Sequence, residues 1–402
     1  MLSPDSDDGG FMTELTGADG NGGRRVDLDW VRILAFGLLI FYHVGMAYVP
    51  WNWHIKSAHQ IAELEPVMRL VNPWRLALLF LVSGAATHFL AAKTQGADLF
   101  RSRTWRLLLP LAFGMLVIVP PQTYIEVAEK TGYSGSFFGF YRDHYLAFGT
   151  EFCRPGPCLI MPTWNHLWFV AYLWVYTMIA CMLSPAALQR AADVLARWLT
   201  GPMLIIAPVL LLALYRIVLW PHFPSTHALV GDWYNHALFG TFFLFGLLFA
   251  RTPGIWAAID RYRWVSLVLG AGSYALWIGL LGISVITTPW LGAVRGLLYA
   301  LDQWGFTLAA LGFAGRWLTR DSAIRRYLTD AIFPCYIIHQ TAIIVIVVWL
   351  KPFGLSTGLE AIIVIVGTAI ASIAAYEAVR RVAWLRPLFG LKRASGGAAP
   401  VR

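Results

Sequence analysis

Charged residues are scarce in this sequence. Asp, Glu, Lys and Arg make up 13% of the 402 residues, about half the share found in soluble domains, whereas 58% of the residues are hydrophobic and the mean hydropathy is +0.60. This balance excludes an ordinary soluble globular domain and predicts an integral membrane protein.

Two other patterns are missing. The sequence has no series of short segments with alternating polar and apolar residues, which marks an outer-membrane barrel, and no cysteine and histidine spacing fits a zinc site. No metal is therefore expected. Apolar runs near the length of a transmembrane helix, about 20 residues, recur instead. We predict an all-α, polytopic membrane protein with about ten transmembrane helices. The predicted spans are residues 31–49, 73–92, 107–127, 165–184, 200–220, 236–250, 264–284, 291–313, 331–350 and 359–379.

The net charge of +9 does not indicate nucleic-acid binding, because the basic residues are placed as in a membrane protein. Most of the 31 Lys and Arg residues fall in the termini and in alternate connections between spans, and few fall in the other connections. By the positive-inside rule, the basic side is cytoplasmic. Both termini are therefore expected in the cytoplasm, which agrees with an even number of spans.

The chain is expected to form one membrane domain between two short tails. Residues 1–23 are acidic and Gly-rich and are expected to be a disordered cytoplasmic tail rather than a cleavable signal peptide. Residues 24–384 would form the transmembrane domain, and residues 385–402 a basic cytoplasmic tail. In an outer connection, Cys153 and Cys158 bracket the turn-forming sequence RPGP, which leaves a disulfide and two free thiols equally open.

The first span contains two ionisable residues that are costly in hydrocarbon. Arg32 and His43 are eleven residues apart, which is about three helical turns, so the two side chains face nearly the same way at different depths. Asp29 lies three residues before Arg32 and can pair with it. Arg32 has the alternative of reaching the cytoplasmic headgroups, and His43 that of a hydrogen-bonded packing residue.

Three arginines precede the third span in the sequence FRSRTWRLLLP. Arg103 and Arg106 are three residues apart at an expected cytoplasmic helix start, and Arg101 lies just before them. Guanidinium groups suit bidentate recognition of phosphate, and a helix start adds backbone donors. The alternative is an ordinary positive-inside anchor.

Other polar residues mark later spans as candidates for substrate binding. His166 opens the fourth span within an aromatic-rich stretch, which can also be an interfacial aromatic belt. His339 and Gln340 lie in the otherwise apolar ninth span. Arg75 follows NPW at the outer start of the second span, and Arg295 lies seven residues before Asp302, with which it can pair.

Together these pieces resemble the acyltransferase-3 family over most of residues 25–380. The resemblance rests on the joint order of LDWVR with His43, Arg103-x-x-Arg106, FLVSG, HLWF and YIIHQ. Within FLVSG, Ser83 and Gly84 also permit close helix packing, which needs no functional explanation. The NPWR and HLWF runs are most similar to the glucan-biosynthesis type, whose members modify periplasmic glucans, often with succinyl groups.

The resemblance implies a bacterial inner-membrane enzyme. Such enzymes move an acyl group from cytoplasmic acyl-CoA, here succinyl-CoA or acetyl-CoA, to a hydroxyl of a periplasmic carbohydrate. The arginine cluster would hold the polyanionic end of the donor. Arg32, oriented by Asp29, would support the channel, and His43 would act as general base, with transfer either direct or through His43. Arg75 or Arg295 would take the carboxylate of a succinyl group.

Two other function classes stay open at this stage. Charged groups inside ten spans also fit a transporter or flippase for a lipid-linked or small anionic substrate, although two matching halves with Gly- and Pro-broken helices are missing. A membrane sensor or scaffold without chemistry is the third class, and it predicts that His43→Ala leaves the biological output unchanged.

Overall fold

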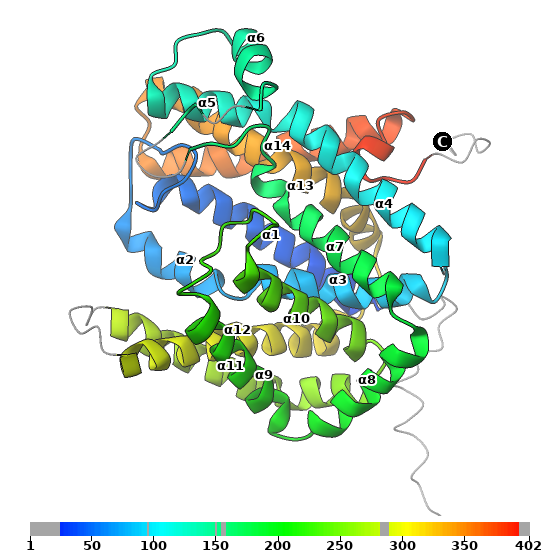
Figure 1. Cartoon of the computed structure of the whole chain (residues 1–402). Coiled ribbons are helices and arrows are strands. Elements are labelled where there is room, and N and C mark those ends of the chain that lie inside the picture. Colours follow the sequence, from blue (N-terminus) through cyan, green and yellow to red (C-terminus); the bar gives the residue numbers. More distant parts are fainter. Residues whose placement is uncertain (1–24, 95, 149–150, 154–157, 282–288, 394–402) are drawn as a thin grey trace, which may run out of the picture.

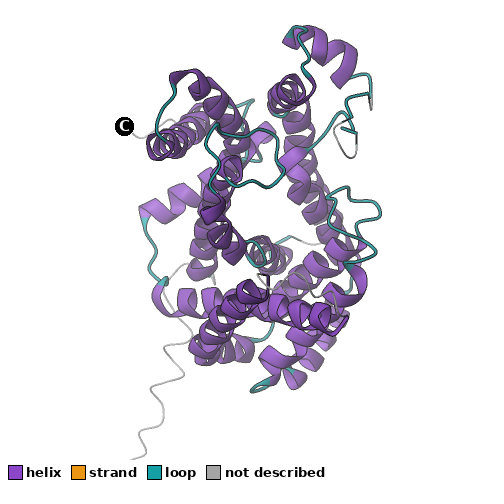
Figure 2. Cartoon of the chain, turned by 90° about the vertical axis from the view of Figure 1, so that its left-hand side faces the viewer, coloured by secondary structure: helices purple, strands orange, loops and turns teal. Residues whose placement is uncertain are grey.

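A computed structural model describes residues 25–94, 96–148, 151–153, 158–281 and 289–393. This part of the chain consists of helices and loops, and its one β-type feature is an isolated bridge between Cys153 and Cys158 (Figures 1 and 2). The helices are α1 (Val26–Tyr48), α2 (Glu65–Val71), α3 (Arg75–Ala91), α4 (Gly96–Phe113), α5 (Pro120–Thr131), α6 (Phe137–Phe140), α7 (Trp168–Met182), α8 (Pro185–Trp198), α9 (Met203–Leu214), α10 (Trp233–Phe249), α11 (Pro253–Leu281), α12 (Pro289–Trp317), α13 (Ala323–Leu350) and α14 (Thr357–Arg381). The all-α fold class is confirmed.

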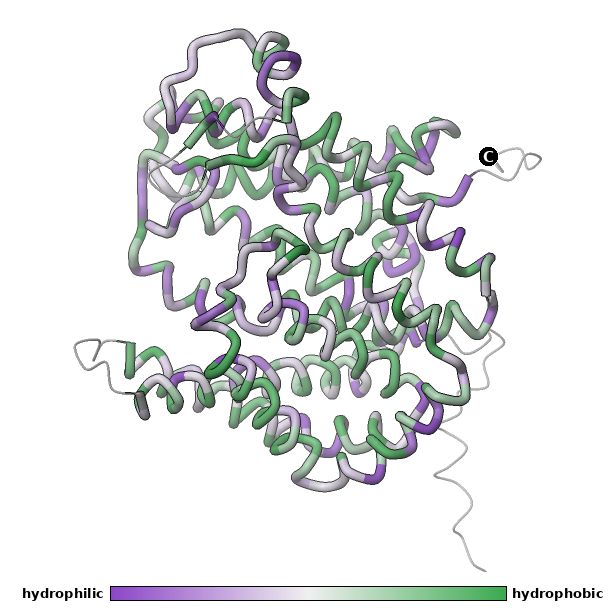
Figure 3. The backbone as a smooth tube through the Cα atoms, in the orientation of Figure 1, coloured by the Kyte–Doolittle hydropathy of each residue, from purple (hydrophilic) through white to green (hydrophobic). Residues whose placement is uncertain are grey.

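The described helices make the chain a multi-pass membrane protein. Five of the helical segments are long and apolar enough to cross a membrane, or up to seven if two bent pairs each count as one span. Met203–Leu219 and Trp233–Phe249 are apolar but shorter. All ten predicted spans fall on helices, yet the number ten is not confirmed. Most of the hydrophobic colour in Figure 3 lies along the helices.

Several segments predicted as basic connections are helical. Residues 189–198 belong to α8, an amphipathic helix that turns by 103° from α7 and buries Leu188 and Ala192 while its charged residues face outward. Ser184 starts this helix, because its side chain accepts a hydrogen bond from the backbone N–H of Ala187 at 3.1 Å. Likewise, α11 begins at Pro253, inside the connection expected at residues 251–264.

Close backbone contact joins α3 to α10. A Cβ atom added at Gly84 would lie 1.9 Å from the carbonyl oxygen of Phe243, and one added at Gly246 would lie 1.8 Å from that of Leu81. Neither glycine can be replaced without moving a helix, so the expected packing role of Gly84 is confirmed.

Three arginine contacts show which helix ends share one face. Arg103 donates to the Thr87 hydroxyl at 3.1 Å, Arg106 to the Gly390 carbonyl at 3.1 Å, and Arg32 to the Thr329 carbonyl at 3.5 Å. The starts of α1, α4 and α13, the end of α3 and the segment after α14 therefore meet at what we name the arginine face (Figure 1). The expected C-terminal tail thus packs on α4 as far as Gly390. The expected N-terminal tail and residues 394–402 lie outside the described residues.

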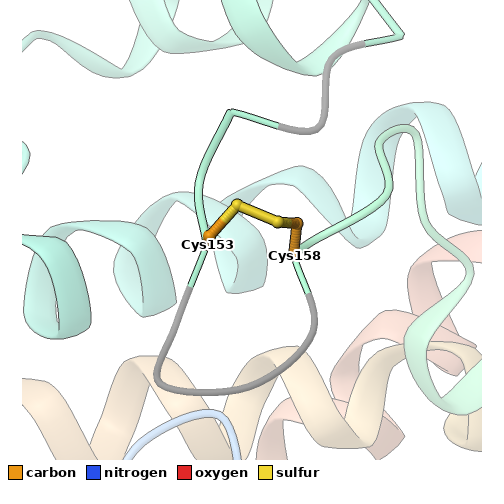
Figure 4. Close-up of a disulfide and its surroundings, with 2 residues drawn as sticks. All are labelled: Cys153 and Cys158. Carbon is orange, nitrogen blue, oxygen red and sulfur yellow. A yellow bond between two sulfur atoms is a disulfide. The ribbon is translucent and has the colours of Figure 1, made fainter.

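The connection after α1 and the connection before α7 lie at the opposite face. The segment before α7 carries the disulfide between Cys153 and Cys158 (Figure 4). The structure therefore decides between the two alternatives that the sequence left open for these cysteines.

Candidate active site

A cavity of about 680 Å³ lies between α1, α3, α7, α10, α12 and α13. Its volume falls in the range of about 300–1,000 Å³ that is usual for small-molecule sites. Four of the residues singled out from the sequence line it, and they come from four separate segments: His43, Arg75, His166 and Gln340.

His43 lies in contact with His339. The Nδ1 atom of His43 is 3.1 Å from Nε2 of His339, which is fully buried on α13. The Nδ1 atom of His339 lies 2.6 Å from the carbonyl oxygen of Tyr336, and a carbonyl only accepts, so this nitrogen carries the proton. In a neutral His339 ring, Nε2 is therefore the acceptor, and His43 Nδ1 must be the donor. Neutral His43 therefore carries its proton on Nδ1 and a lone pair on Nε2. With this lone pair the ring can accept a proton, as a general base must.

His166 also packs against His339, with the two ring centres 5.0 Å apart. Its Nε2–H donates to the carbonyl of Ile337 at 3.1 Å, whereas its Nδ1 atom is buried and has no hydrogen-bond partner. The hydroxyl of Tyr336 donates to the carbonyl of His166. His166 is thus held in one orientation with an acceptor atom to spare.

Gln122, which the sequence did not single out, links two parts of the cavity wall. Its fully buried side-chain oxygen accepts hydrogen bonds from Asn165 and from Gln340, both at 3.0 Å. Its amide nitrogen donates to the Thr341 hydroxyl at 2.6 Å. These bonds fix the Gln340 side chain beside the histidines.

Arg75 is a buried cation without a carboxylate partner in the described part of the chain. It is 6% exposed, donates to the side-chain oxygen of Asn72 at 2.6 Å, and lies 3.3 Å from the ring centre of Tyr42. Its Nε atom has no hydrogen-bond partner. A buried cation in this state favours an anionic ligand in the cavity.

Arg295 is placed differently. It does not belong to the cavity lining, and it donates to the carbonyl of Leu280 at 2.7 Å. The predicted pairing with Asp302 is wrong, because both carboxylate oxygens of Asp302 are buried without a hydrogen-bond partner among the residues that the structure describes. Seven residues return a helix to the same face but separate the two positions by about 10 Å along its axis.

The predicted phosphate-binding arginines lie at the arginine face. The charges of Arg103, Arg106 and Arg32 are close enough to interact, and Arg101 is exposed at the edge of this group. Because Arg32 and His43 share α1, about 16 Å of helix separates the arginine group from the cavity histidine.

Asp29 forms an ion pair that the sequence did not reveal. Its carboxylate contacts Arg325 of α13, which is 1% exposed and also bonds Asp321 at 2.8 Å. The pairing of Asp29 with Arg32 stays a prediction. Residue spacing gave no signal for Arg325, because it lies almost 300 positions away from Asp29.

The connection after α1 adds a further histidine to the cavity wall. His54 Nδ1 lies 2.6 Å from a carboxylate oxygen of Glu126, whose other oxygen is 3.0 Å from Lys130 Nζ. Lys56 in the same connection donates to the carbonyls of Met46 and Val49 at 2.6 and 2.7 Å. These bonds hold residues 49–57 over the cavity.

Comparison with known proteins places the chain in a family. The model of a family described as an acyltransferase domain matches residues 25–377. The glucans biosynthesis protein C of Escherichia coli strain K12 and that of Escherichia coli O1:K1 / APEC are each 24% identical over 155 residues. This stretch covers 38% of the chain and 37% of each relative, so the chain matches little more than a third of their length. No solved structure matches the chain.

Proposed function

The chain belongs to the acyltransferase-3 family, whose domain covers residues 25–377, and from this premise we propose a specific reaction. The protein moves an acyl group, succinyl or acetyl, from acyl-CoA to a hydroxyl of a periplasmic carbohydrate such as a glucan. It does so as a multi-pass protein of the bacterial inner membrane.

The single observation that carries this proposal is the hydrogen bond between His43 and His339 at the cavity wall. It supports His43 Nε2 as the atom that takes the proton of the acceptor hydroxyl. As this proton leaves, the hydroxyl oxygen attacks the thioester carbon, and an ester bond forms. The carbon–sulfur bond breaks, and the departing thiolate of coenzyme A takes the proton from the His43 imidazolium.

His339 acts in this scheme through His43, as a positioning residue. His166 and Gln340 present an acceptor nitrogen and an amide beside the reacting atoms, so we assign them to substrate binding. The two roles differ because His166 and Gln340 line the cavity, whereas His339 does not.

The arginine face supports the donor end of the reaction. Arg103, Arg106 and Arg32 come together there and offer guanidinium donors for the phosphates of coenzyme A, with Arg101 at the rim. The pantetheine arm would then run along α1 for about 16 Å toward His43.

Arg75 supports a dicarboxylic acyl group. Its guanidinium, which has no carboxylate partner among the described residues, lines the same cavity as His43 and lies within electrostatic reach of that ring. A succinyl carboxylate would find there the cation that a neutral acetyl group does not need. Arg295 is not assigned a role in the reaction, because it lies outside the cavity lining.

The disulfide supports an assignment of the two faces of the protein to the two sides of the membrane. Disulfides persist in oxidising compartments such as the bacterial periplasm. The face with Cys153 and Cys158 would therefore be periplasmic and the arginine face cytoplasmic, in agreement with the charge distribution of the sequence.

The test uses the full chain in lipid nanodiscs. Wild type and His43→Ala are compared for thiol release from acetyl-CoA and succinyl-CoA, with and without a mixture of periplasmic glucans. We expect glucan-stimulated release in the wild type and its loss in a monodisperse variant. Glucan-stimulated release that survives in His43→Ala would refute the assigned base. Absence of release with every donor and acceptor in the wild type would favour a transporter.

A further inference from the structure

Besides Arg75, two arginines line the cavity, and the reaction scheme uses neither: Arg69, which pairs with Glu65, and Arg216. Arg216 lies in the π-helical turn that follows α9, Tyr215–Leu219, and it lines the cavity. Its guanidinium carbon is 3.9 Å from the ring centre of Trp220 and 4.3 Å from that of Tyr299. In the described part of the chain, Arg216 forms no ion pair.

This arrangement leaves part of the edge of the guanidinium available. The rings of Trp220 and Tyr299 interact with its positive charge, and the Tyr234 hydroxyl accepts one of its hydrogen bonds, so the remaining in-plane N–H groups can donate to a ligand. Those N–H groups form the planar fork that binds the two oxygens of a carboxylate or a phosphate. An oxyanion is therefore the class of ligand that suits this side chain.

The neighbouring connection is fixed around a buried carboxylate. Asp232 accepts hydrogen bonds from the Tyr172 hydroxyl at 2.6 Å, from the His227 backbone N–H at 2.9 Å and from the Asn235 amide at 2.8 Å. These bonds, from the connection itself and from the flanking helices α7 and α10, satisfy Asp232. The carboxylate therefore serves to order the loop and is not used as a partner for Arg216.

The ordered loop brings polar groups to the same end of the cavity. Asn235 donates to the Ser225 hydroxyl at 2.6 Å, and both residues line the cavity with His227, whose ring stacks on Trp168 at 4.1 Å between centres. His227 has a left-handed backbone with φ of 58°, a conformation that is uncommon for this residue type and often found at functional positions.

We propose that Arg216, Trp220, Ser225, Tyr234, Asn235 and Tyr299 form an acceptor subsite for a saccharide with an anionic substituent, either a phosphate ester or a carboxylate. Arg216 binds the oxyanion, the aromatic rings pack on the apolar face of a sugar ring, and Ser225 and Asn235 bind its hydroxyls. The inference rests on the proposed acyl transfer and deepens it, because it names the class of acceptor.

In this proposal, the cations Arg75 and Arg216 bind different parts of the reacting molecules. Tyr299 lies within electrostatic reach of both Arg75 and Arg216, and Arg75 lies within reach of His43 as well. Arg75 can therefore serve the acyl group near the reacting atoms, while Arg216 anchors the acceptor from the side of Tyr299. An acceptor anchored at Arg216 would present its hydroxyl to His43 in a defined position.

Calorimetric titration of the full chain in nanodiscs tests this subsite without catalysis. The probes are glucose 6-phosphate, glucuronate, glucose and inorganic phosphate. We expect the two anionic sugars to bind more tightly than glucose and more tightly than inorganic phosphate. Arg216→Gln should weaken both anionic sugars by about tenfold or more, as expected for a lost hydrogen bond to a charged group, and should leave glucose unchanged.

Two variants serve as controls for charge and geometry. Arg216→Lys keeps the charge without the fork and should bind the anionic sugars with intermediate affinity. Arg142→Gln removes an exposed arginine that pairs with Asp143 outside the cavity, and it should bind all probes like the wild type.

The proposal is overturned by equal affinities for glucose and glucose 6-phosphate, or by equal weakening of all sugars in Arg216→Gln. It is also overturned if inorganic phosphate binds as tightly as glucose 6-phosphate, which would show a bare anion site. A wild type that binds the anionic sugars but transfers no acyl group would keep the subsite and remove the proposed reaction.

Discussion

The hydrogen bond between His43 and His339 can be tested by a double-mutant cycle. His339→Ala removes the atom that accepts the Nδ1–H of His43, so the base loses both its fixed orientation and its fixed tautomer. The loss of one hydrogen bond is worth about 0.5–1.5 kcal/mol, which corresponds to about a tenfold fall in kcat at its upper end. Removal of the base in His43→Ala should cost about 10²–10⁴-fold.

The two losses should not add. If His339 acts only through His43, the double variant should have the kcat of His43→Ala alone, because there is no base left to position. The assay is acceptor-stimulated thiol release with saturating acyl-CoA, and KM for acyl-CoA should stay the same in His339→Ala. Thermal unfolding is the control, because His339 is fully buried. A further tenfold loss in the His43→Ala background would refute the positioning role.

Three more predictions follow from charged groups elsewhere in the protein. Arg75→Gln should lower activity with succinyl-CoA by about tenfold or more and leave acetyl-CoA activity unchanged, whereas equal losses with both donors would contradict the carboxylate role. Arg103→Gln with Arg106→Gln should raise KM for acyl-CoA and reduce its salt dependence, with kcat unchanged, and an unaltered KM would remove the donor site from the arginine face. Burial, with a smaller contribution from Lys130, lowers the pKa of Lys56 from 10.5 to about 8. Between these pH values the unfolded chain binds more protons than the folded chain, so the free energy of unfolding should rise with pH across that window. Thermal unfolding at pH 7.5, 9 and 10 should show this rise in the wild type and a smaller one in Lys56→Gln, and parallel curves for the two proteins would refute it.

Hydrophobic length was a sound guide to the helices of this protein. A run of about 20 apolar residues has few stable alternatives in a bilayer, so each predicted span falls on a helix. The same criterion failed for α8 and for the start of α11, because an amphipathic or charged helix at the membrane surface has no such run. Helix periodicity, rather than mean hydropathy, would have found α8.

The candidate site was only partly accessible to sequence. His43 and His339 were detectable, because an ionisable side chain in an apolar segment is costly and stands out. Their contact was not, since it joins positions almost 300 residues apart and depends on how α1 packs against α13. Gln122 was missed because it is uncharged and belongs to no pattern whose spacing indicates a partner. Arg216 lies within the span predicted at residues 200–220, but nothing in its spacing indicated a role.

The close backbone contacts at Gly84 and at Gly246 also have a consequence for how substrates reach the cavity. Two helices whose backbones touch cannot slide or tilt past each other without a clash, so α3 and α10 move as one rigid body. Arg75 and Asn235 stand on these two helices and therefore keep a constant separation during turnover. We therefore expect the motion that admits an acceptor to involve wall elements other than this pair of helices.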